Sequence, residues 1–191
     1  MKKRYFFLFI TYLWLSFPLP AIAQEKSLQI GGKLINEFTF YNGFAPGFGG
    51  QVVYRIGKHG GIESGLNYQN KYLSIFTTLI VGGNSYNYYT KIAEHHLQIP
   101  LFYRYDSKAI NFSAGPMLDY FIGWDVRHTD PGVTVNNYDR NTVSLAGTAG
   151  VSRSFYLSPT IILEPELKFN YILTEDDGGV SINIALRKKL F

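Results

Sequence analysis

Charged side chains recur at alternate positions within several apolar stretches of this chain. In the stretch from Leu163 to Tyr171, the residues Glu164, Glu166 and Lys168 fall at every second position. Alternate residues of a β-strand lie on one face, so charges at this spacing could pair with one another, relay protons or guide ions. The residues that the same spacing places on charged faces are Lys33, Glu37, Arg55, Glu63, Arg104, Asp119, Glu164, Glu166 and Lys168.

These nine residues would point inward if the strands closed into a barrel. The interior of an eight-stranded barrel is just wide enough for side chains to fill, and a buried charge needs a partner of opposite sign. We therefore expect the nine side chains to pair and to plug the lumen. A narrow ion path or a proton relay through the same residues is the alternative that the sequence leaves open.

The other residues capable of chemistry form no recognisable site. His95 and His96 are adjacent, so in a strand they point to opposite faces and do not share a metal ion. Ser85, Asp125 and His128 are the residue types of a hydrolase, but no spacing connects them. We predict a protein that is not an enzyme and that binds no metal or cofactor.

The elements that would position the charged residues are eight segments in which apolar and polar residues alternate. Each has a length near the ~9–11 residues with which a tilted strand crosses a membrane. The segments are Leu28–Phe40, Phe48–Ile56, Ile62–Gln69, His96–Tyr105, Ile110–Ile122, Val143–Ser152, Leu163–Tyr171 and Val180–Leu186. They predict an all-β fold, an eight-stranded antiparallel up-and-down transmembrane barrel.

Short and long connections alternate between these segments. The short ones are Gly57–Gly60, Tyr105–Ala109 and Phe155–Pro159, and the longer ones are Tyr41–Pro46, Gly82–Thr90, Gly123–Asn141 and Leu173–Gly179. Outer-membrane barrels have short periplasmic turns and long outer loops. A soluble lipocalin-like barrel would show the same alternation with its apolar face inside, but it has no reason to sort its loops in this way.

The longest predicted connection, Gly123–Asn141, contains the candidates for binding a partner. Loops held by a rigid scaffold often carry binding residues. The candidates are Trp124, Arg127, His128, Tyr138 and Arg140, with Tyr86, Tyr88 and Tyr89 in the neighbouring connection. Outer loops that bind nothing are the competing interpretation.

The first 23 residues have the layout of a secretory signal peptide. Lys2, Lys3 and Arg4 precede an apolar stretch, two prolines follow it, and Ala21-Ile22-Ala23 supplies a cleavage site. We therefore divide the chain into a signal peptide, residues 1–23, and a barrel domain, residues 24–191. An exported chain rich in strands that ends in Phe191 is expected in the outer membrane of a Gram-negative bacterium.

The charge of the chain argues against a nucleic-acid partner. The sequence has 18 Lys and Arg against 14 Asp and Glu, and three of the positive residues precede residue 24. The exported part is therefore nearly neutral and has no basic stripe of the kind that binds nucleic acid. The expected surroundings are outer-membrane lipid and lipopolysaccharide. The chain has no cysteine, which excludes disulfides.

Several short motifs resemble those of a family of small Gram-negative outer-membrane barrels, the PorT-like proteins of the porin family. The motifs are Ile30–Asn36, Gly61–Tyr68, His96–Leu101, Ser113–Leu118 and the terminal Phe191. The resemblance implies the same barrel fold and a role for Phe191 as the signal read by the outer-membrane assembly machinery. The family's namesake is linked to protein secretion and gliding.

Two roles follow from these observations. The first is a structural or interaction protein that acts through its outer loops on an unknown protein partner. The alternative, implied by the resemblance, is a component of a secretion or surface-attachment apparatus that is contacted at its periplasmic turns. A lipid-modifying enzyme or a narrow channel is less well supported.

Overall fold

The computed structural model describes residues 26–40, 43–81, 84–131, 133, 135, 140–174 and 177–191. The signal peptide predicted for residues 1–23 lies outside them. Within the described residues no helix is long and apolar enough to cross a membrane. The strands of the structure are β1 (Ser27–Thr39), β2 (Gly43–Arg55), β3 (Gly60–Val81), β4 (Asn84–Tyr105), β5 (Asn111–Thr129), β6 (Val143–Ser152), β7 (Phe155–Tyr156), β8 (Ile161–Ile172) and β9 (Asp177–Lys189).

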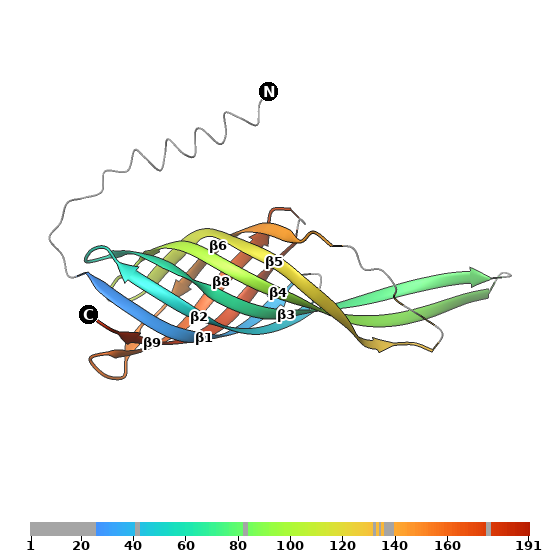
Figure 1. Cartoon of the computed structure of the whole chain (residues 1–191), viewed down its shortest axis with the longest axis horizontal. Coiled ribbons are helices and arrows are strands. Elements are labelled where there is room, and N and C mark those ends of the chain that lie inside the picture. Colours follow the sequence, from blue (N-terminus) through green and yellow to red (C-terminus); the bar gives the residue numbers. More distant parts are fainter. Residues whose placement is uncertain are drawn as a thin grey trace, which may run out of the picture.

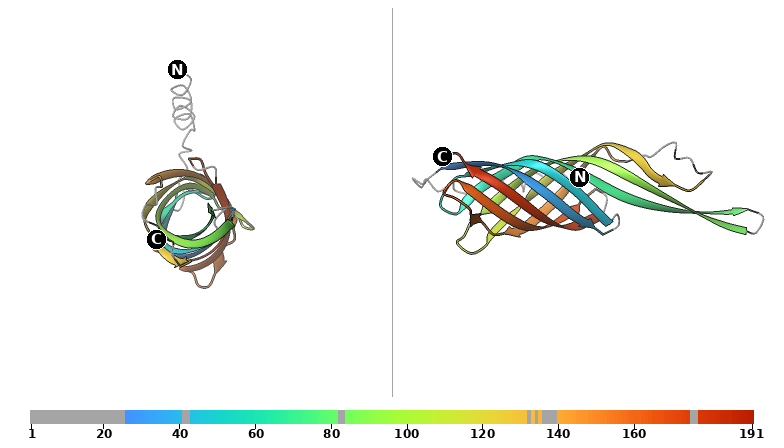
Figure 2. Two further views of the ribbon diagram at one scale, coloured as in Figure 1. Left: turned by 90° about the vertical axis from the view of Figure 1, so that its right-hand side faces the viewer. Right: turned by 90° about the horizontal axis from the view of Figure 1, so that it is seen from below.

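Eight of these strands form a closed ring. Each strand from β1 to β6 pairs with the next in antiparallel fashion, β6 pairs with β8, β8 with β9, and β9 returns to β1. The two-residue strand β7 lies in the turn after β6 and pairs only with β8. The predicted eight-stranded antiparallel up-and-down barrel is therefore confirmed, and Figure 2 shows the ring from its end.

The strands are staggered around the ring, as closure of a barrel requires. The stagger is found by stepping from a residue of β1 to its partner on the next strand and so on around the ring. The residues met in turn are Leu28, Tyr54, Ile62, Tyr103, Ala114, Ala149, Phe169, Val180 and Phe38. The path starts at Leu28 and returns to β1 at Phe38, ten residues further on. A stagger of this kind accompanies a strand tilt of roughly 35–45° in barrels of this size.

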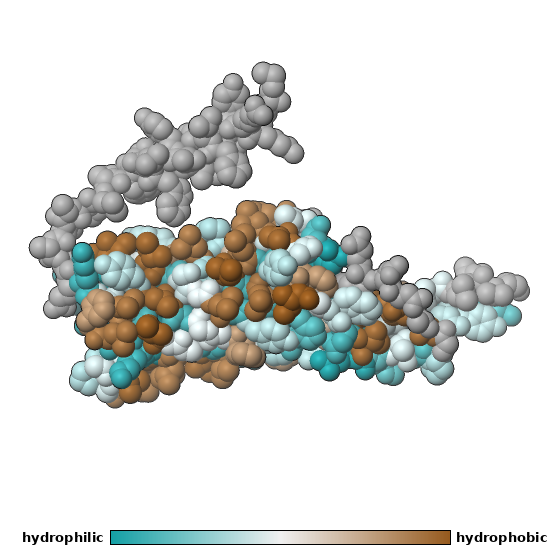
Figure 3. Space-filling view, in the orientation of Figure 1, coloured by the Kyte–Doolittle hydropathy of each residue, from teal (hydrophilic) through white to brown (hydrophobic). Residues whose placement is uncertain are grey.

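The two faces of the wall differ sharply in polarity. Leu34 is 60% exposed on the outside, whereas the preceding residue, Lys33, is 5% exposed and points into the lumen. The same alternation places Ile99, Leu118 and Ile184 on the outside. Figure 3 shows apolar side chains gathered over the barrel and more hydrophilic ones over the part that projects from it.

Aromatic residues flank the apolar outer wall. Tyr54, Tyr103 and Tyr105 are exposed near the end of the barrel that carries the short turns. Tyr120 and Tyr171 are exposed towards the opposite end. Membrane barrels have girdles of aromatic residues at both interfaces, so the outer wall has the composition of a surface that contacts lipid.

Glycines on the inner face allow neighbouring strands to approach closely. A Cβ atom added to Gly31 would lie 2.1 Å from the carbonyl oxygen of Leu186 and 2.8 Å from Cα of Arg187. No such conflict exists at Gly147, which points outward and has no atom within 4 Å of the same position. The glycine at residue 31 is therefore a steric requirement of the curved wall.

We expect Gly31→Ala to lower the free energy of unfolding by about 1–3 kcal/mol, the usual cost of forcing extra atoms into a packed site. Gly147→Ala serves as the matched control and should change it little, because its methyl group enters open space. The measurement is urea unfolding of both variants in lipid vesicles. Equal losses for the two variants would contradict the steric explanation.

The bounds predicted for the four longer connections were wrong. Strand β2 already begins at Gly43, β4 at Asn84 and β9 at Asp177, and β5 continues to Thr129. The longest strands, β3 and β4, continue far past the ring as a hairpin (Figure 1). The polar residues in these segments suggested loops, but their backbone groups pair with a neighbouring strand, and this pairing outweighs local composition.

Candidate functional site

The lumen near the short turns holds a group of paired charges centred on Arg104, which is 1% exposed. Its guanidinium donates to three carboxylates: Nη2 to Glu164 at 2.7 Å, Nε to Asp106 at 2.7 Å and Nη1 to Glu63 at 3.2 Å. Arg187 also donates to Glu164. Arginine suits this position because its fork of donors can serve several carboxylates at once.

Lysines complete this inner network. Lys168 Nζ lies 2.9 Å from Glu63 Oε1 and 3.2 Å from Glu166 Oε2, and it lies over the ring of Phe102. Lys33 Nζ lies 4.0 Å from Glu63. We define the inner network as Lys33, Arg55, Glu63, Arg104, Asp106, Glu164, Glu166, Lys168 and Arg187.

A second group of charges lies further along the lumen, around His96. Its ring nitrogens lie 2.6 Å from Asp119 Oδ1 and 3.2 Å from Glu94 Oε2. Lys71 donates to Asp119 at 2.7 Å, and Arg140 donates to the carboxylate of Glu94. We call these five residues the outer network.

Every carboxylate of the two networks lies against at least one cation, as a buried charge requires, although the inner network has five cations and four carboxylates. Glu37, also buried, accepts from Nε2 of Gln69 at 2.8 Å. It forms no ion pair with another described residue, so the predicted charge pairing is not seen for Glu37. Within the described residues no group of three or more His, Cys, Asp or Glu side chains could hold a metal ion. The two networks of paired charges fill the lumen and stiffen the barrel.

All nine residues that the sequence placed on charged inner faces lie in or at the lumen. Eight of them are buried, whereas the side chain of Arg55 is 23% exposed and pairs with Asp106 at the mouth of the barrel. The sequence analysis did not assign six other residues of the two networks to the lumen: Lys71, Glu94, His96, Asp106, Arg140 and Arg187. His96 stands on the inner face of its predicted segment, and Lys71, Glu94, Asp106 and Arg187 continue the alternation past the ends of the predicted segments, so this signal could have identified all of them except Arg140.

Beyond the ring, three strands continue together as a projecting sheet. The last pair between β2 and β3 is Gly47–Gln69, but β3 remains paired with β4 as far as Val81 and Asn84. Strand β5 accompanies β4 up to Thr129. We define the projecting sheet as residues 70–81, 84–95 and 123–129. At its base Lys71 and Glu94 still point into the lumen. The hairpin of β3 and β4 reaches furthest (Figure 1).

A polar cluster fastens the base of this sheet on its outer side. His95 Nδ1 lies 2.7 Å from both the hydroxyl of Tyr68 and Oδ1 of Asn70, and its Nε2 lies 3.0 Å from Asp125. Arg127 Nε lies 3.1 Å from the other oxygen of Asp125. These contacts join β3, β4 and β5 where they leave the ring.

Aromatic and uncharged polar residues dominate the projecting sheet above this cluster. The ring of Tyr89 lies 5.1 Å from that of Phe76 and 5.7 Å from that of His128. Thr78 donates to Asn87 at 2.9 Å, and Tyr86 is 48% exposed. Tyrosine, serine and asparagine also predominate in antibody paratopes, where they provide rigid contact area and adaptable hydrogen bonds.

The binding candidates from the predicted longest loop occupy different environments. Trp124, Arg127 and His128 lie in strand β5 and not in a loop. The sequence did not predict this part of the strand because two bulges, opposite Lys91–Ile92 and His95–His96, interrupt the alternation. Arg140 belongs to the lumen rather than to an exposed loop surface. Tyr138 lies outside the described residues.

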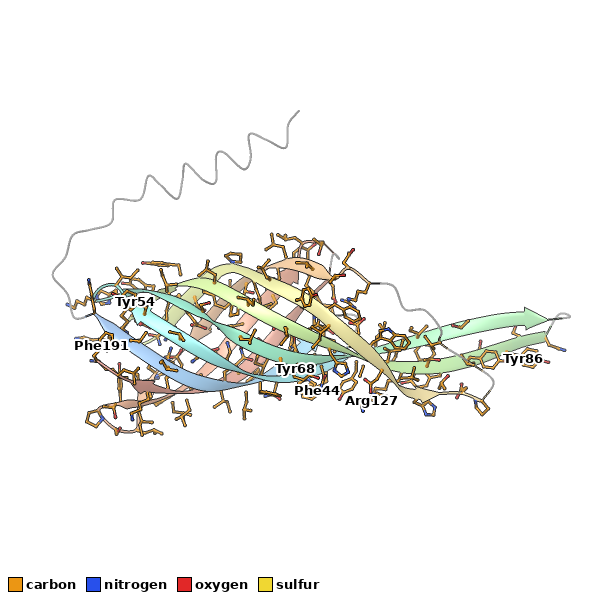
Figure 4. All side chains as sticks on the ribbon, viewed as in Figure 1. Phe44, Tyr54, Tyr68, Tyr86, Arg127 and Phe191 are labelled. Atoms are coloured by element: carbon orange, nitrogen blue, oxygen red, sulfur yellow. The ribbon has the colours of Figure 1, made fainter. Side chains whose placement is uncertain are left out.

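Phe191 lies at the end of the barrel opposite to the projecting sheet, close to Tyr54 (Figure 4). Its side chain is 63% exposed, and its carbonyl oxygen accepts from the amide of Leu28. Tyr86 and Arg127 lie on the projecting side in the same view. The two ends of the molecule thus carry different candidate functions, a terminal aromatic residue at one and the projecting sheet at the other.

Comparisons with known proteins found similarity in solved structures only; no protein-family model and no curated protein sequence matches the chain. Neisserial surface protein A is 16% identical, with 85% of this chain and 96% of that chain covered and a TM-score of 0.45. The attachment invasion locus protein Ail of Yersinia pestis is 11% identical, with 86% and 97% covered and a TM-score of 0.43. The N-terminal β-barrel domain of Pseudomonas aeruginosa OprF is 10% identical, with 85% and 99% covered and a TM-score of 0.43. Similarity at this level assigns no function, and the description of the fold rests on the strand pairing itself.

Proposed function

We propose that this chain is an outer-membrane barrel of a Gram-negative bacterium, related to the PorT-like proteins. The apolar outer wall, its flanking tyrosines and the paired charges in the lumen support this location, because lipid would cover the wall and the charges would stay inside. Lipid and lipopolysaccharide surround the barrel in this proposal. Phe191, exposed at the end with the short turns, serves the assembly machinery.

The proposed role is non-enzymatic binding of a partner outside the cell by the projecting sheet. The observation that carries it is the continuation of β3 and β4 past the ring, as far as Val81 and Asn84. At about 3.3 Å per residue, the segment of β3 after Gln69 spans roughly 40 Å. A filled lumen supports binding rather than transport of large solutes, since the inner and outer networks occupy the space that a solute would need.

Photo-crosslinking in living cells tests this role. We expect a photoreactive amino acid at Tyr86 to capture a protein partner, because this side chain is exposed on the projecting hairpin. The same amino acid at Leu118, which is exposed on the apolar wall, is the control and should capture lipid but no defined protein. Adducts are detected as discrete bands on a denaturing gel.

A third position, Lys108, separates the two candidate roles. This residue is exposed in the short turn between β4 and β5. Protein adducts at Lys108 and none at Tyr86 would overturn the proposed role. That result would favour the alternative, a component of a secretion or surface-attachment apparatus contacted at its periplasmic turns.

A further inference from the structure

Strand β3 has an open edge along the projecting sheet. Its pairing with β2 ends at Gly47–Gln69, whereas its pairing with β4 continues without a shift of register to Val81. Among the described strands, none pairs with β3 on the β2 side beyond Gln69. Strand β2 itself runs on for four residues past Gly47, to Gly43, and Gln69 Nε2 donates to the carbonyl oxygen of Ala45. In the register of the two strands, Gly43 would stand opposite Leu73, so the edge of β3 extends beyond the end of β2 from Ser74 onward.

The backbone groups that face this edge can be identified from the turn that precedes β3. The carbonyl oxygen of Gly60 accepts from Ile56 on the β2 side, and that of His59 accepts from Asp106 on the β4 side. Successive residues of a strand direct their backbone groups to opposite edges. In the absence of a register shift, the even-numbered residues Ser74, Phe76 and Thr78 thus direct N–H and C=O groups to the open edge.

This edge lacks the features that usually prevent strands from pairing with other chains. Exposed edges are normally protected by charges, prolines, bulges or a covering segment. The residues from Asn70 to Thr78 include no proline, and their register with β4 shows no bulge. Their one charge, Lys71, is buried in its ion pair with Asp119.

We propose that the open edge of β3 binds its partner by strand addition, in which an extended segment of a partner polypeptide pairs antiparallel with β3 from Ser74 onward. This inference rests on the proposed role of the projecting sheet and specifies its partner. Main-chain hydrogen bonds would supply affinity, and side chains at alternate positions would supply specificity.

The chemistry of the edge, where Ser74 and Thr78 alternate with aromatic residues, selects a strand with aromatic and small polar side chains and without Lys or Arg. Tyr72 and Phe76 border the edge on one face of the sheet and Leu73 and Ile75 on the other. Lys91 of β4 stands opposite Ser74, and its Nζ lies 5.0 Å from the centre of the Tyr72 ring, so a partner strand that carries Lys or Arg would be repelled. A second copy of the chain in the same membrane runs in the same direction, so it could form only the less stable parallel pairing.

The probe for this proposal is a fluorescent peptide with the sequence of residues 84–90. This segment is uncharged and already pairs with β3 along the opposite edge, so its side chains suit the strand. Binding to the full barrel in lipid nanodiscs is measured by fluorescence anisotropy. We expect the peptide to bind and a fully N-methylated peptide, which has the same side chains but no backbone donors, to bind at least about tenfold more weakly.

Substitutions in β3 test the protein side. Ser74→Pro removes a donor at the open edge without removing a hydrogen bond to β4, and proline is tolerated in that position of an edge strand. We expect about tenfold weaker peptide binding, with Ser74→Ala binding like the wild type. Thr78→Pro is a second edge variant should Ser74→Pro fail to fold.

Strand addition would be overturned if the two peptides bound equally or if Ser74→Pro bound the peptide as well as the wild type. It would also be overturned if the unmodified peptide did not bind. If any of these three results were found together with protein adducts at Tyr86, the proposed role would remain and binding would be assigned to a face of the sheet. Loss of those adducts as well would remove the proposed role.

Discussion

Replacing Glu164 by Gln is expected to lower the free energy of unfolding by about 3–5 kcal/mol, the usual cost of removing one partner from a buried ion pair. Glu164 is fully buried and accepts from both Arg104 and Arg187. Glutamine has nearly the same shape, so the packing stays while the negative charge is lost. Two guanidinium groups would then face each other in the lumen without their shared carboxylate.

The measurement is urea unfolding in lipid vesicles, followed by the difference in gel mobility between unheated and boiled samples. Arg127→Gln is the matched control because Arg127 and Asp125 form an ion pair that is about half exposed. Pairs of that kind contribute about 0–1 kcal/mol. If both variants lost the same stability, the inner network would not be the support of the barrel that its geometry indicates.

Periodicity predicted the ring and its polar interior because a strand in a membrane barrel must satisfy both surroundings at once. Lys33 and Leu34 show this at adjacent positions, one buried in the lumen and one exposed on the wall. The alternation is thus a direct record of which residue faces which side. The side to which each residue points could therefore be predicted without knowing how the strands pair.

The projecting sheet could not be predicted in this way. Beyond the ring neither face of the hairpin is wholly lipid or wholly lumen, so the segment from Asn84 to Thr90 shows no alternation and has the composition of a loop. It is a strand because it pairs with residues 75–81 of β3. In β5 the bulges near Ile122 and Arg127 had the same effect, since each extra residue shifts the alternation by one position.

Arg140 is the member of the outer network that no local pattern predicts. Arg140 reaches Glu94 from the connection between β5 and β6, and the two are far apart in the sequence. The residues around Arg140 have no periodicity that would direct its side chain inward. Its place in the lumen is seen only in the three-dimensional arrangement, in which it donates to Glu94.

Placing a charge on the outer wall has the second large expected effect, and it tests whether lipid covers that wall. Ile184 is 49% exposed in the middle of the outward row of β9, between Ile182 and Leu186. In a bilayer, Ile184→Arg should cost about 2–4 kcal/mol, the penalty for a cation near the midplane of a membrane barrel. In a barrel surrounded by water, the same exposed substitution would change stability by no more than about 0.5 kcal/mol.

Thr78→Arg is the matched control because Thr78 is exposed on the projecting sheet, outside the apolar wall. The free energy of unfolding in lipid vesicles should fall for Ile184→Arg and stay within about 0.5 kcal/mol for Thr78→Arg. The contrast arises because the two arginines differ in their surroundings and not in their charge. A neutral result at both positions, with the folded chain recovered in the soluble periplasm, would mean that water covers the wall. The apolar face would then be a binding surface in its own right, and the paired charges of the lumen would no longer indicate a membrane protein.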